Sequence, residues 1–318
     1  MTAPGFPPAR PDAVRPFTVG IPASASEPDL AGTLHSVHRS AAATGGDYEI
    51  LVAVNGSEDP APALAGVRTF AAAASMTLRE SEEPAGDIWP VVRVLRLRER
   101  SKVAAWNAIR VAARTPVIVF GDADVRLAPD AIGLLLARLE TVPALAAATG
   151  REAAALAAGD GLVARVAALP YRFDFGNVPG RLYALRTAAL PEPMPAHVLH
   201  EDAYLSVRLG RDRFAKVDAA VVYLRPPTTW REYLDQRVRN ELGKLQLAAE
   251  FPELLRAHGF GATPWRAFLR GIRPHEYPLA ALSLLTRLYA RVQARRRARA
   301  RGFDRGWAAL PSTKVWET

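Results

Sequence analysis

Apolar runs alternate with helical patterns over the first half of the chain. The runs have the length and flanking turn residues of strands that are buried on both faces, whereas the segments between them place apolar residues at helical spacing. Strands are predicted at 17–21, 49–54, 91–95 and 117–120, and helices from Leu30 onward and over 61–74, 102–113 and 129–139. This alternation predicts a mostly parallel sheet with helices on both faces, an α/β fold of the Rossmann-like kind.

The pattern changes after about residue 150. A loop is expected over 171–180, strands over 181–185 and 216–224, and helices over 201–209, 229–249 and 277–301. The last helix is rich in arginine and carries apolar residues on roughly one face, namely Leu279, Leu282, Leu285, Leu288 and Val292. The sequence therefore predicts a C-terminal helical extension that is basic and amphipathic.

Charge and cysteine content limit the classes of function that the chain can have. The chain carries a formal net charge of +9 and contains no cysteine, which excludes disulfides, thiolate metal sites and cysteine nucleophiles. The positive charge suits anionic partners such as nucleotide phosphates or an acidic membrane face. Nucleic acid is not expected, because the arginine run lacks interleaved aromatic residues. No signal peptide or apolar span of about 20 residues is found, so the cytoplasm is the expected location.

Three predicted loops should meet at one edge of the sheet, because ligands of such sheets bind at the carboxyl ends of the strands. They are Pro22-Ala23, Asn55-Gly56-Ser57 and Gly121 to Asp124. Asp122 and Asp124 directly follow a buried strand, and Mg²⁺ or Mn²⁺ commonly bridges one or two such carboxylates to substrate phosphates. The alternative is that Asp124 only caps a turn or the next helix.

Further candidates lie at helix starts. Lys102 and Asn107 begin the helix before the Asp122 strand, where a lysine and a helix N-terminus favour a phosphate; a solvated lysine is the alternative. Glu201 and Asp202 open a later helix, either as caps or with Asp202 as the general base that deprotonates an acceptor hydroxyl.

The long helix that begins near Thr229 carries an arginine that could bind an anionic ligand. Gln236 and Arg239 lie on it, and an arginine there could clamp a diphosphate or an acceptor. His197 and His200 do not match the spacing of zinc proteases, so they are interpreted as structural or acceptor-side residues.

Taken in order, these segments resemble the family-2 glycosyltransferases of the GT-A fold. The resemblance covers about residues 16–250 and rests on an ordered series of short motifs. They are Val19 to Pro22, Glu49 to Asp59, Lys102 to Asn107, Val119 to Asp124, Gly180 to Arg186, His200 to Asp202 and Gln236 to Asn240.

The resemblance implies an inverting, metal-dependent transfer of one sugar from a nucleotide-sugar donor to an acceptor hydroxyl. Asp202, with Glu201, would be catalytic, and Asp122 and Asp124 would hold Mg²⁺ or Mn²⁺. The donor would contact Pro22, Ala23, Asn55, Glu58, Lys102, Asn107, Asp122, Ala123, Gln236 and Arg239. A UDP-sugar is the favoured donor and a GDP-sugar the second candidate, and the acceptor would be a glycan, a lipid-linked molecule or a small molecule of cell-envelope or polysaccharide synthesis.

The resemblance also divides the chain. Residues 1–15 would be a disordered N-terminal segment, and 16–250 the GT-A domain. Within it, 16–125 would form the nucleotide-sugar-binding half and 126–250 the acceptor and catalytic half. Residues 251–318 would form the C-terminal basic helical region.

Two departures from the family pattern bear on function. Val54 stands where the family usually has an aspartate that contacts the nucleobase, so base recognition would fall to Asn55 or Glu58. Asn240 replaces the tryptophan of the last motif, which favours a non-processive enzyme. A non-catalytic binding protein on a degenerate glycosyltransferase scaffold is the alternative function.

The C-terminal helix has two interpretations. It could attach the protein to the inner face of the cell membrane as an interfacial helix, with leucines on one face and arginines on the other. Alternatively, it packs on its own domain with solvated arginines.

Overall fold

The computed structural model describes residues 15–56, 59–80, 89–173, 180–190, 192–258, 268, 270–303, 310–314 and 316. The predicted disordered segment 1–15 lies outside these residues except for Arg15. Among the described helices, none is both long and apolar enough to cross a membrane.

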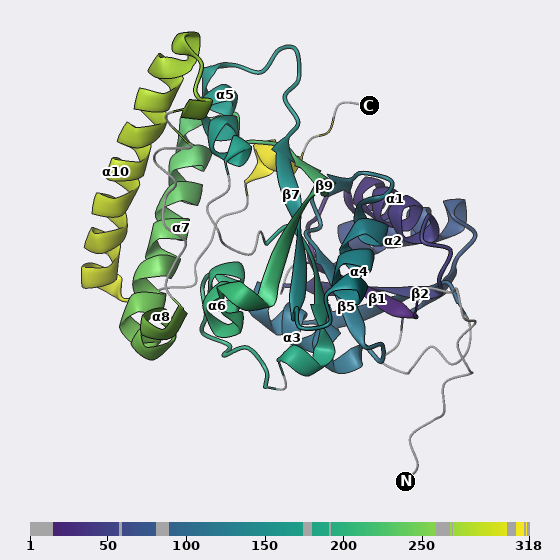
Figure 1. The fold of residues 1–318 in the computed structure, drawn as a ribbon. Coiled ribbons are helices and arrows are strands. Elements are labelled where there is room, and N and C mark those ends of the chain that lie inside the picture. The colour runs from purple at the N-terminus through teal and green to yellow at the C-terminus, as the bar shows by residue number, and fades with distance from the viewer. Residues whose placement is uncertain are drawn as a thin grey trace.

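A single mixed sheet forms the centre of the molecule (Figure 1). Its strands are β1 (Phe17–Ser24), β2 (Tyr48–Asn55), β3 (Thr77–Arg79), β4 (Val91–Leu97), β5 (Val117–Gly121), β6 (Val125–Leu127), β7 (Ala147–Ala154), β8 (Leu182–Arg186) and β9 (Phe214–Leu224). Across the described sheet their order is β3-β4-β2-β1-β5-β8-β7-β9-β6. The five strands from β3 to β5 are parallel, and β8 pairs antiparallel with both β5 and β7. The predicted parallel half is thus extended by a mixed half.

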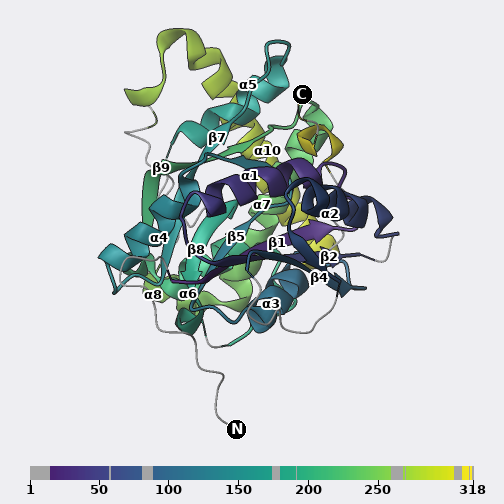
Figure 2. The same cartoon turned by 90° about the vertical axis from the view of Figure 1, so that its right-hand side faces the viewer.

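Helices cover both faces of this sheet (Figure 2). They are α1 (Leu30–Ala42), α2 (Ala61–Ala73), α3 (Lys102–Ala112), α4 (Ala131–Thr141), α5 (Leu162–Ala168), α6 (Glu201–Leu209), α7 (Trp230–Glu250), α8 (Pro252–His258) and α10 (Tyr277–Arg301). One apolar core joins α1, α2 and α4 to the sheet, and a second joins α3 and α6 to its other face. The alternating faces of β2 and β5 contribute to both cores, which explains why these strands read as continuous apolar runs.

The sequence missed the short or weakly apolar elements. It predicted neither β3, β6 nor β7 as strands, nor α5 and α8 as helices. β7 reads AATGREAA, with small and polar residues in place of β-branched ones, and its pairing with β9 shifts register after Gly150. A side chain at Gly150 would lie 2.7 Å from the Ala220 carbonyl oxygen, so close backbone approach requires glycine at this irregularity.

The C-terminal helices form a layer beside the sheet, where α10 packs along α7 (Figure 1). The side of α10 that is buried consists of small or hydroxyl residues, Ala280, Ser283, Thr286, Ala290 and Ala294. By contrast, Leu285, Leu288 and Val292 are exposed. Packing on the domain therefore uses the small residues and leaves much of the predicted apolar face uncovered.

Candidate active site

The ends of β1 and β2 lie side by side at the carboxyl edge of the sheet. Their register pairs Ala23 with Val54 and Ser24 with Asn55. Asn55 donates a hydrogen bond from Nδ2 to the Ala23 carbonyl oxygen at 2.8 Å. The side chains of Pro22 and Ala23 are buried, so these two residues offer backbone groups to a ligand. Glu58 lies outside the described residues.

Asp122 and Asp124 follow β5 and belong to a cluster of charged side chains. Ala123 between them is buried, and its carbonyl oxygen accepts a hydrogen bond from Thr33 Oγ1 at 2.7 Å. The amide of Asp122 donates to the Arg181 carbonyl oxygen at 3.2 Å. These backbone contacts fix the turn, and the two carboxylates keep 17% and 22% of their side-chain surface exposed.

Lys102 joins the two acidic motifs. It is the first residue of α3, whose N-cap Ser101 accepts a hydrogen bond from the Ala104 amide. Its Nζ lies 2.6 Å from Asp122 Oδ1 and also contacts Glu201 Oε1 at the start of α6. Desolvation lowers the pKa of Lys102, but the two carboxylates outweigh it and raise the pKa well above its ordinary value. The lysine is therefore a fixed positive charge between the two motifs.

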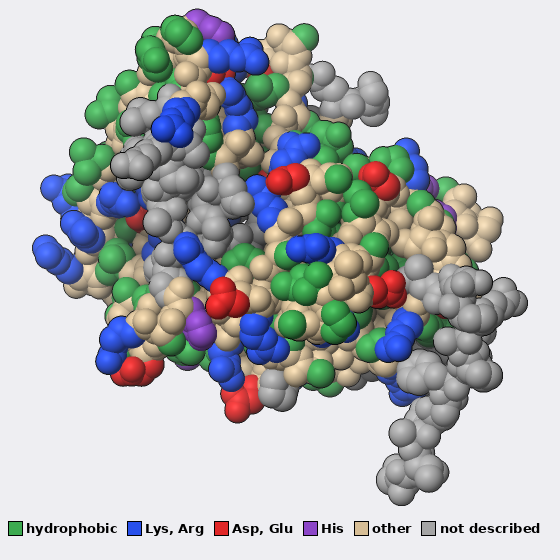
Figure 3. All heavy atoms as spheres, in the orientation of Figure 1, with side chains coloured by type: hydrophobic (Ala, Val, Ile, Leu, Met, Phe, Trp, Pro, Cys, Tyr) green, Lys and Arg blue, Asp and Glu red, His purple; other side chains and the backbone are tan. Residues whose placement is uncertain are grey.

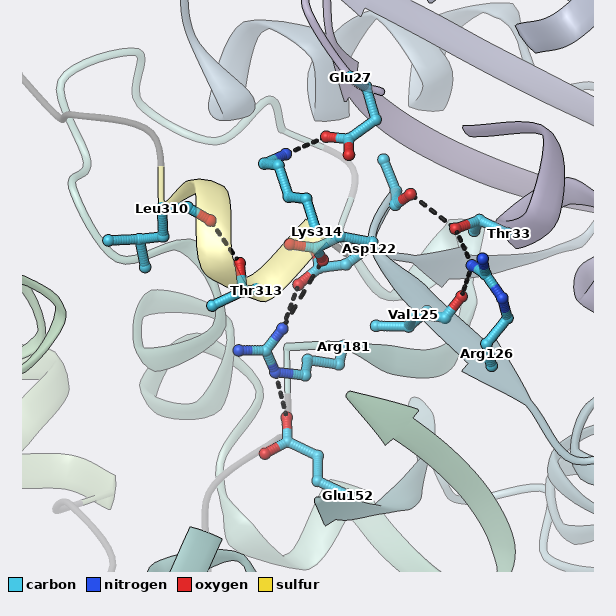
Figure 4. A network of polar contacts seen from close by, with 12 residues as sticks. Glu27, Thr33, Asp122, Val125, Arg126, Glu152, Arg181, Leu310, Thr313 and Lys314 are labelled. Atoms are coloured by element: carbon cyan, nitrogen blue, oxygen red, sulfur yellow. Dashed lines mark hydrogen bonds and ion pairs between the residues drawn. The ribbon is translucent and has the colours of Figure 1, made fainter. Parts of the chain in front are cut away.

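Arg181 is a second cation of this cluster and lies between Asp122 and Glu152 (Figure 4). It directly precedes β8, and one of its terminal nitrogens lies 3.6 Å from Asp122 Oδ2 and 3.8 Å from Asp124 Oδ1. Its Nε lies 3.8 Å from Glu152 Oε1 on β7. At 3.6–3.8 Å these contacts are ion pairs longer than good hydrogen bonds, so a ligand oxygen can compete for the guanidinium.

Asp202 lies beside Gly180. A Cβ at Gly180 would come within 2.7 Å of Asp202 Oδ2, so the turn before β8 passes Asp202 without a side chain at this position. Asp202 Oδ1 is 2.9 Å from His200 Nε2 and accepts a hydrogen bond from the Ala203 amide at 2.7 Å. Desolvation raises the pKa of Asp202, but His200 and, next, Lys102 outweigh it and hold the pKa well below its usual range.

The pKa of Glu152 is shifted in the opposite direction to that of Asp202. Burial raises its pKa to about 7, and Asp202 and Asp122 add to that shift while Arg181 opposes it. Burial also raises the pKa of the neighbouring Tyr171, which interacts with Arg181. These mutual influences place Asp122, Glu152 and Asp202 in one electrostatic environment.

Three of the predicted donor residues have other contacts or are partly buried. Both ends of the Asn107 amide bind the backbone of Met194, at 2.8 and 2.9 Å, so this side chain holds the loop before α6. Gln236 is buried on α7, and Arg239 is half-buried on the same helix. On α7 it is Arg237 whose charge acts on Tyr171 in the cluster.

Comparison with known proteins finds a family that part of the chain resembles. Residues 18–160 match the family described as Glycosyl transferase family 2. The match covers less than half of the chain. No curated protein matches its sequence.

Several solved structures are similar to this chain. A mannosyltransferase from Pyrobaculum calidifontis, in complex with GDP-Man and Mn²⁺, superposes with a TM-score of 0.54 at 17% identity, over 93% of this chain and 76% of that one. TarS from S. aureus with UDP has a TM-score of 0.47 at 14% identity, over 91% of this chain and 88% of that one. Glucosyl-3-phosphoglycerate synthase from Mycobacterium tuberculosis, with Mn²⁺, UDP and phosphoglyceric acid, has a TM-score of 0.48 at 17% identity, over 74% of this chain and 78% of that one. The likeness to the mannosyltransferase shows that the chain has the predicted GT-A fold.

The acidic residues of this site suit a divalent cation only if the substrate helps to bind it. Among the described residues, no three His, Asp or Glu side chains converge closely enough to hold a metal by themselves. Asp122 and Asp124 nevertheless present oxygen ligands, the type that Mg²⁺ and Mn²⁺ prefer, and such ions often take the remaining ligands from phosphates and water. The donor set therefore fits a metal shared with a diphosphate.

Arg181, Glu152 and Tyr171 were not among the predicted functional residues. Arg181 lies inside the segment Gly180 to Arg186, so its position next to a glycine before a strand was the available signal. The sequence offered no signal for Glu152, because the strand β7 that carries it was not predicted.

Proposed function

We propose that this protein is a glycosyltransferase that moves a single sugar from a nucleotide-sugar donor to an acceptor hydroxyl, with inversion at the anomeric carbon. The observation that carries the proposal is the Lys102 bridge between Asp122 and Glu201, which holds the acidic turn after β5 next to the acidic start of α6. A donor diphosphate bound at the first would place its sugar next to the second.

On the donor side, Asp122 and Asp124 would hold Mg²⁺ or Mn²⁺ together with the diphosphate. When bound, the ion would offset the negative charge that develops on the leaving nucleoside diphosphate. The described acids of the cluster, Asp122, Asp124, Glu152, Glu201 and Asp202, outnumber the cations Lys102 and Arg181. A bare diphosphate would therefore be repelled, which supports a metal-bound donor.

On the acceptor side, Asp202 would act as the general base. Its oxygen takes the proton of the acceptor hydroxyl while the acceptor oxygen bonds to the anomeric carbon and the bond to the diphosphate breaks. The low pKa of Asp202 keeps the carboxylate ionised, and His200 orients it. Asn240 in place of the tryptophan of the last motif supports transfer of one sugar at a time.

A panel of nucleotide sugars tests this function. With Mn²⁺ or Mg²⁺, at least one UDP- or GDP-sugar should release nucleoside diphosphate, and chelation should stop the release. Asp124→Ala should weaken metal-dependent donor binding, measured as loss of thermal stabilisation by the donor. A protein that binds donors but never releases diphosphate would instead be the non-catalytic scaffold.

We further propose that α10 lies on an anionic membrane surface, where the acceptor would be lipid-linked. Leu285 and Leu288 are 62% and 60% exposed, and Tyr277, Leu284 and Tyr289 are exposed near them. Figure 3 shows hydrophobic side chains along one part of the α10 edge and Lys or Arg side chains along the rest. Apolar residues followed by exposed arginines, from Arg291 to Arg299, fit an interfacial helix.

A further inference from the structure

The C-terminal end of the chain returns to the donor edge of the sheet. We call Leu310, η5 (Pro311–Lys314) and Trp316 the C-terminal strap. It lies far outside the matched segment 18–160, and Figure 4 shows it beside Glu27, Asp122 and Arg181. The family domain alone therefore does not account for all residues at this edge.

One end of the strap is attached to α7. Ser312 donates its amide to Glu232 Oε1 at 3.2 Å, and its Oγ accepts the amide of Thr228 at 3.1 Å. Its hydroxyl also contacts the Glu232 carboxylate. Thr313 is buried. These contacts fix the strap to the start of the helix that carries Gln236.

The other end contacts the donor half. Lys314 forms an ion pair with Glu27, which lies between β1 and α1 and is only 2% exposed. Trp316 stacks on Arg126, with the guanidinium carbon 4.6 Å from the ring centroid. Arg126 lies two residues after Asp124 and binds Asp29 and Thr33. The strap thus contacts both the loop that follows β1 and the strand β6 that follows the Asp122–Asp124 turn.

The Glu27–Lys314 pair is poorly explained as a stabilising contact. Burying two charges costs several kcal/mol unless all their oxygens and protons are satisfied, and Glu27 Oε1 is buried with no hydrogen-bond partner. Burial raises the pKa of Glu27 to about 7, Lys314 opposes that rise, and Asp124 adds to it. The pair therefore lies close enough to the Asp122–Asp124 turn for their charges to interact.

We propose that the C-terminal strap completes the donor site and that Lys314 is a binding residue for the donor diphosphate. This inference rests on the proposed function. A lysine is a compact cation suited to phosphate oxygens, and beside Glu27 and the Asp122–Asp124 turn it supplies positive charge to an acidic surrounding. Glu27 holds the ammonium there until a diphosphate arrives.

Matched charge variants test the proposal through the Kd of UDP and of GDP, measured by calorimetry at fixed Mn²⁺. Lys314→Met should weaken binding of the preferred nucleotide roughly tenfold or more, as expected for loss of a charged contact, and Lys314→Arg should retain most of the affinity. Glu27→Gln should leave binding unchanged or tighter, because it frees the lysine. Lys216→Met, at the start of β9, is the control and should match the wild type.

Two results would overturn the inference. If Lys314→Met binds the nucleotide with wild-type affinity, Lys314 is not a binding residue. If Lys314→Met and Glu27→Gln weaken nucleotide binding equally, the ion pair has only a structural role. Thermal unfolding of each variant ensures that all are folded at the temperature of titration. If the wild type binds neither UDP nor GDP, the proposed function fails as well, which separates that outcome from failure of the strap alone.

Discussion

Individual carboxyl groups in the cluster differ sharply in their affinity for protons. His200 holds the pKa of Asp202 low, whereas burial lifts that of Glu152 to about 7. The charge of Asp202 adds to the rise in the pKa of Glu152, so at neutral pH Asp202 is ionised whereas Glu152 is only partly ionised. This division of roles follows from environment, since opposite shifts in neighbouring acids commonly mark functional sites.

The raised pKa of Glu152 predicts a stability effect. Between pH 4.5 and about 7 the folded protein keeps a proton on Glu152 that the unfolded chain releases, so the free energy of unfolding falls as pH rises through this window. Glu152→Gln should remove this fall in the free energy of unfolding. We expect the variant to be more stable than wild type at pH 8, by up to about 3 kcal/mol, and similar below pH 4.5.

Urea unfolding at pH 4.5 and pH 8 measures this difference. Glu140→Gln, on an exposed position of α4, is the control and should show no pH-dependent gain. The same pH dependence in Glu152→Gln and wild type would show that Glu152 titrates normally.

Secondary-structure elements were predictable where local pattern and tertiary role agree. The apolar runs of β1, β2, β4 and β5 and the helical spacing of α3 and α7 reflect burial, so their positions follow from sequence. β7 was missed because small residues fill its buried positions. The bounds of α10 were predicted, but its orientation was not, because α7 accepts the small residues of α10 at close range and leaves its leucines outside.

The exposed face of α10 predicts membrane binding. The wild-type protein should float with vesicles that contain anionic lipid and remain behind with neutral vesicles, and its binding should weaken as salt rises. Replacing Leu285 and Leu288 by serine should abolish flotation without lowering the melting temperature, because both side chains are exposed. Val111→Ser, at a highly exposed position on α3, is the matched control. Undiminished flotation of the double variant would exclude this face as the membrane contact.

The whole molecule assembles its charged cluster from segments that are distant in sequence. Asp122, Asp124, Lys102, Glu201 and Asp202 were predicted as candidates because each belongs to a short motif at an element's end. Arg181 and Glu152 depend on the pairing of β7 with β8, and Glu27 meets Lys314 across 287 positions. Such contacts leave no local pattern, because they are specified by tertiary packing alone. Asn107 shows the opposite case: it belongs to a recognisable motif, but its side chain hydrogen-bonds to the backbone of a neighbouring loop.

The most direct test of the account is the single-turnover rate of sugar transfer in Asp202→Asn, measured with the Kd of the same donor. The amide has nearly the shape of the carboxylate but cannot accept the acceptor proton. We expect the rate to fall by roughly 10²-fold or more, the usual contribution of a general base, while the donor Kd stays close to that of the wild type. A transfer rate equal to that of the wild type would contradict the assignment of Asp202 as the base.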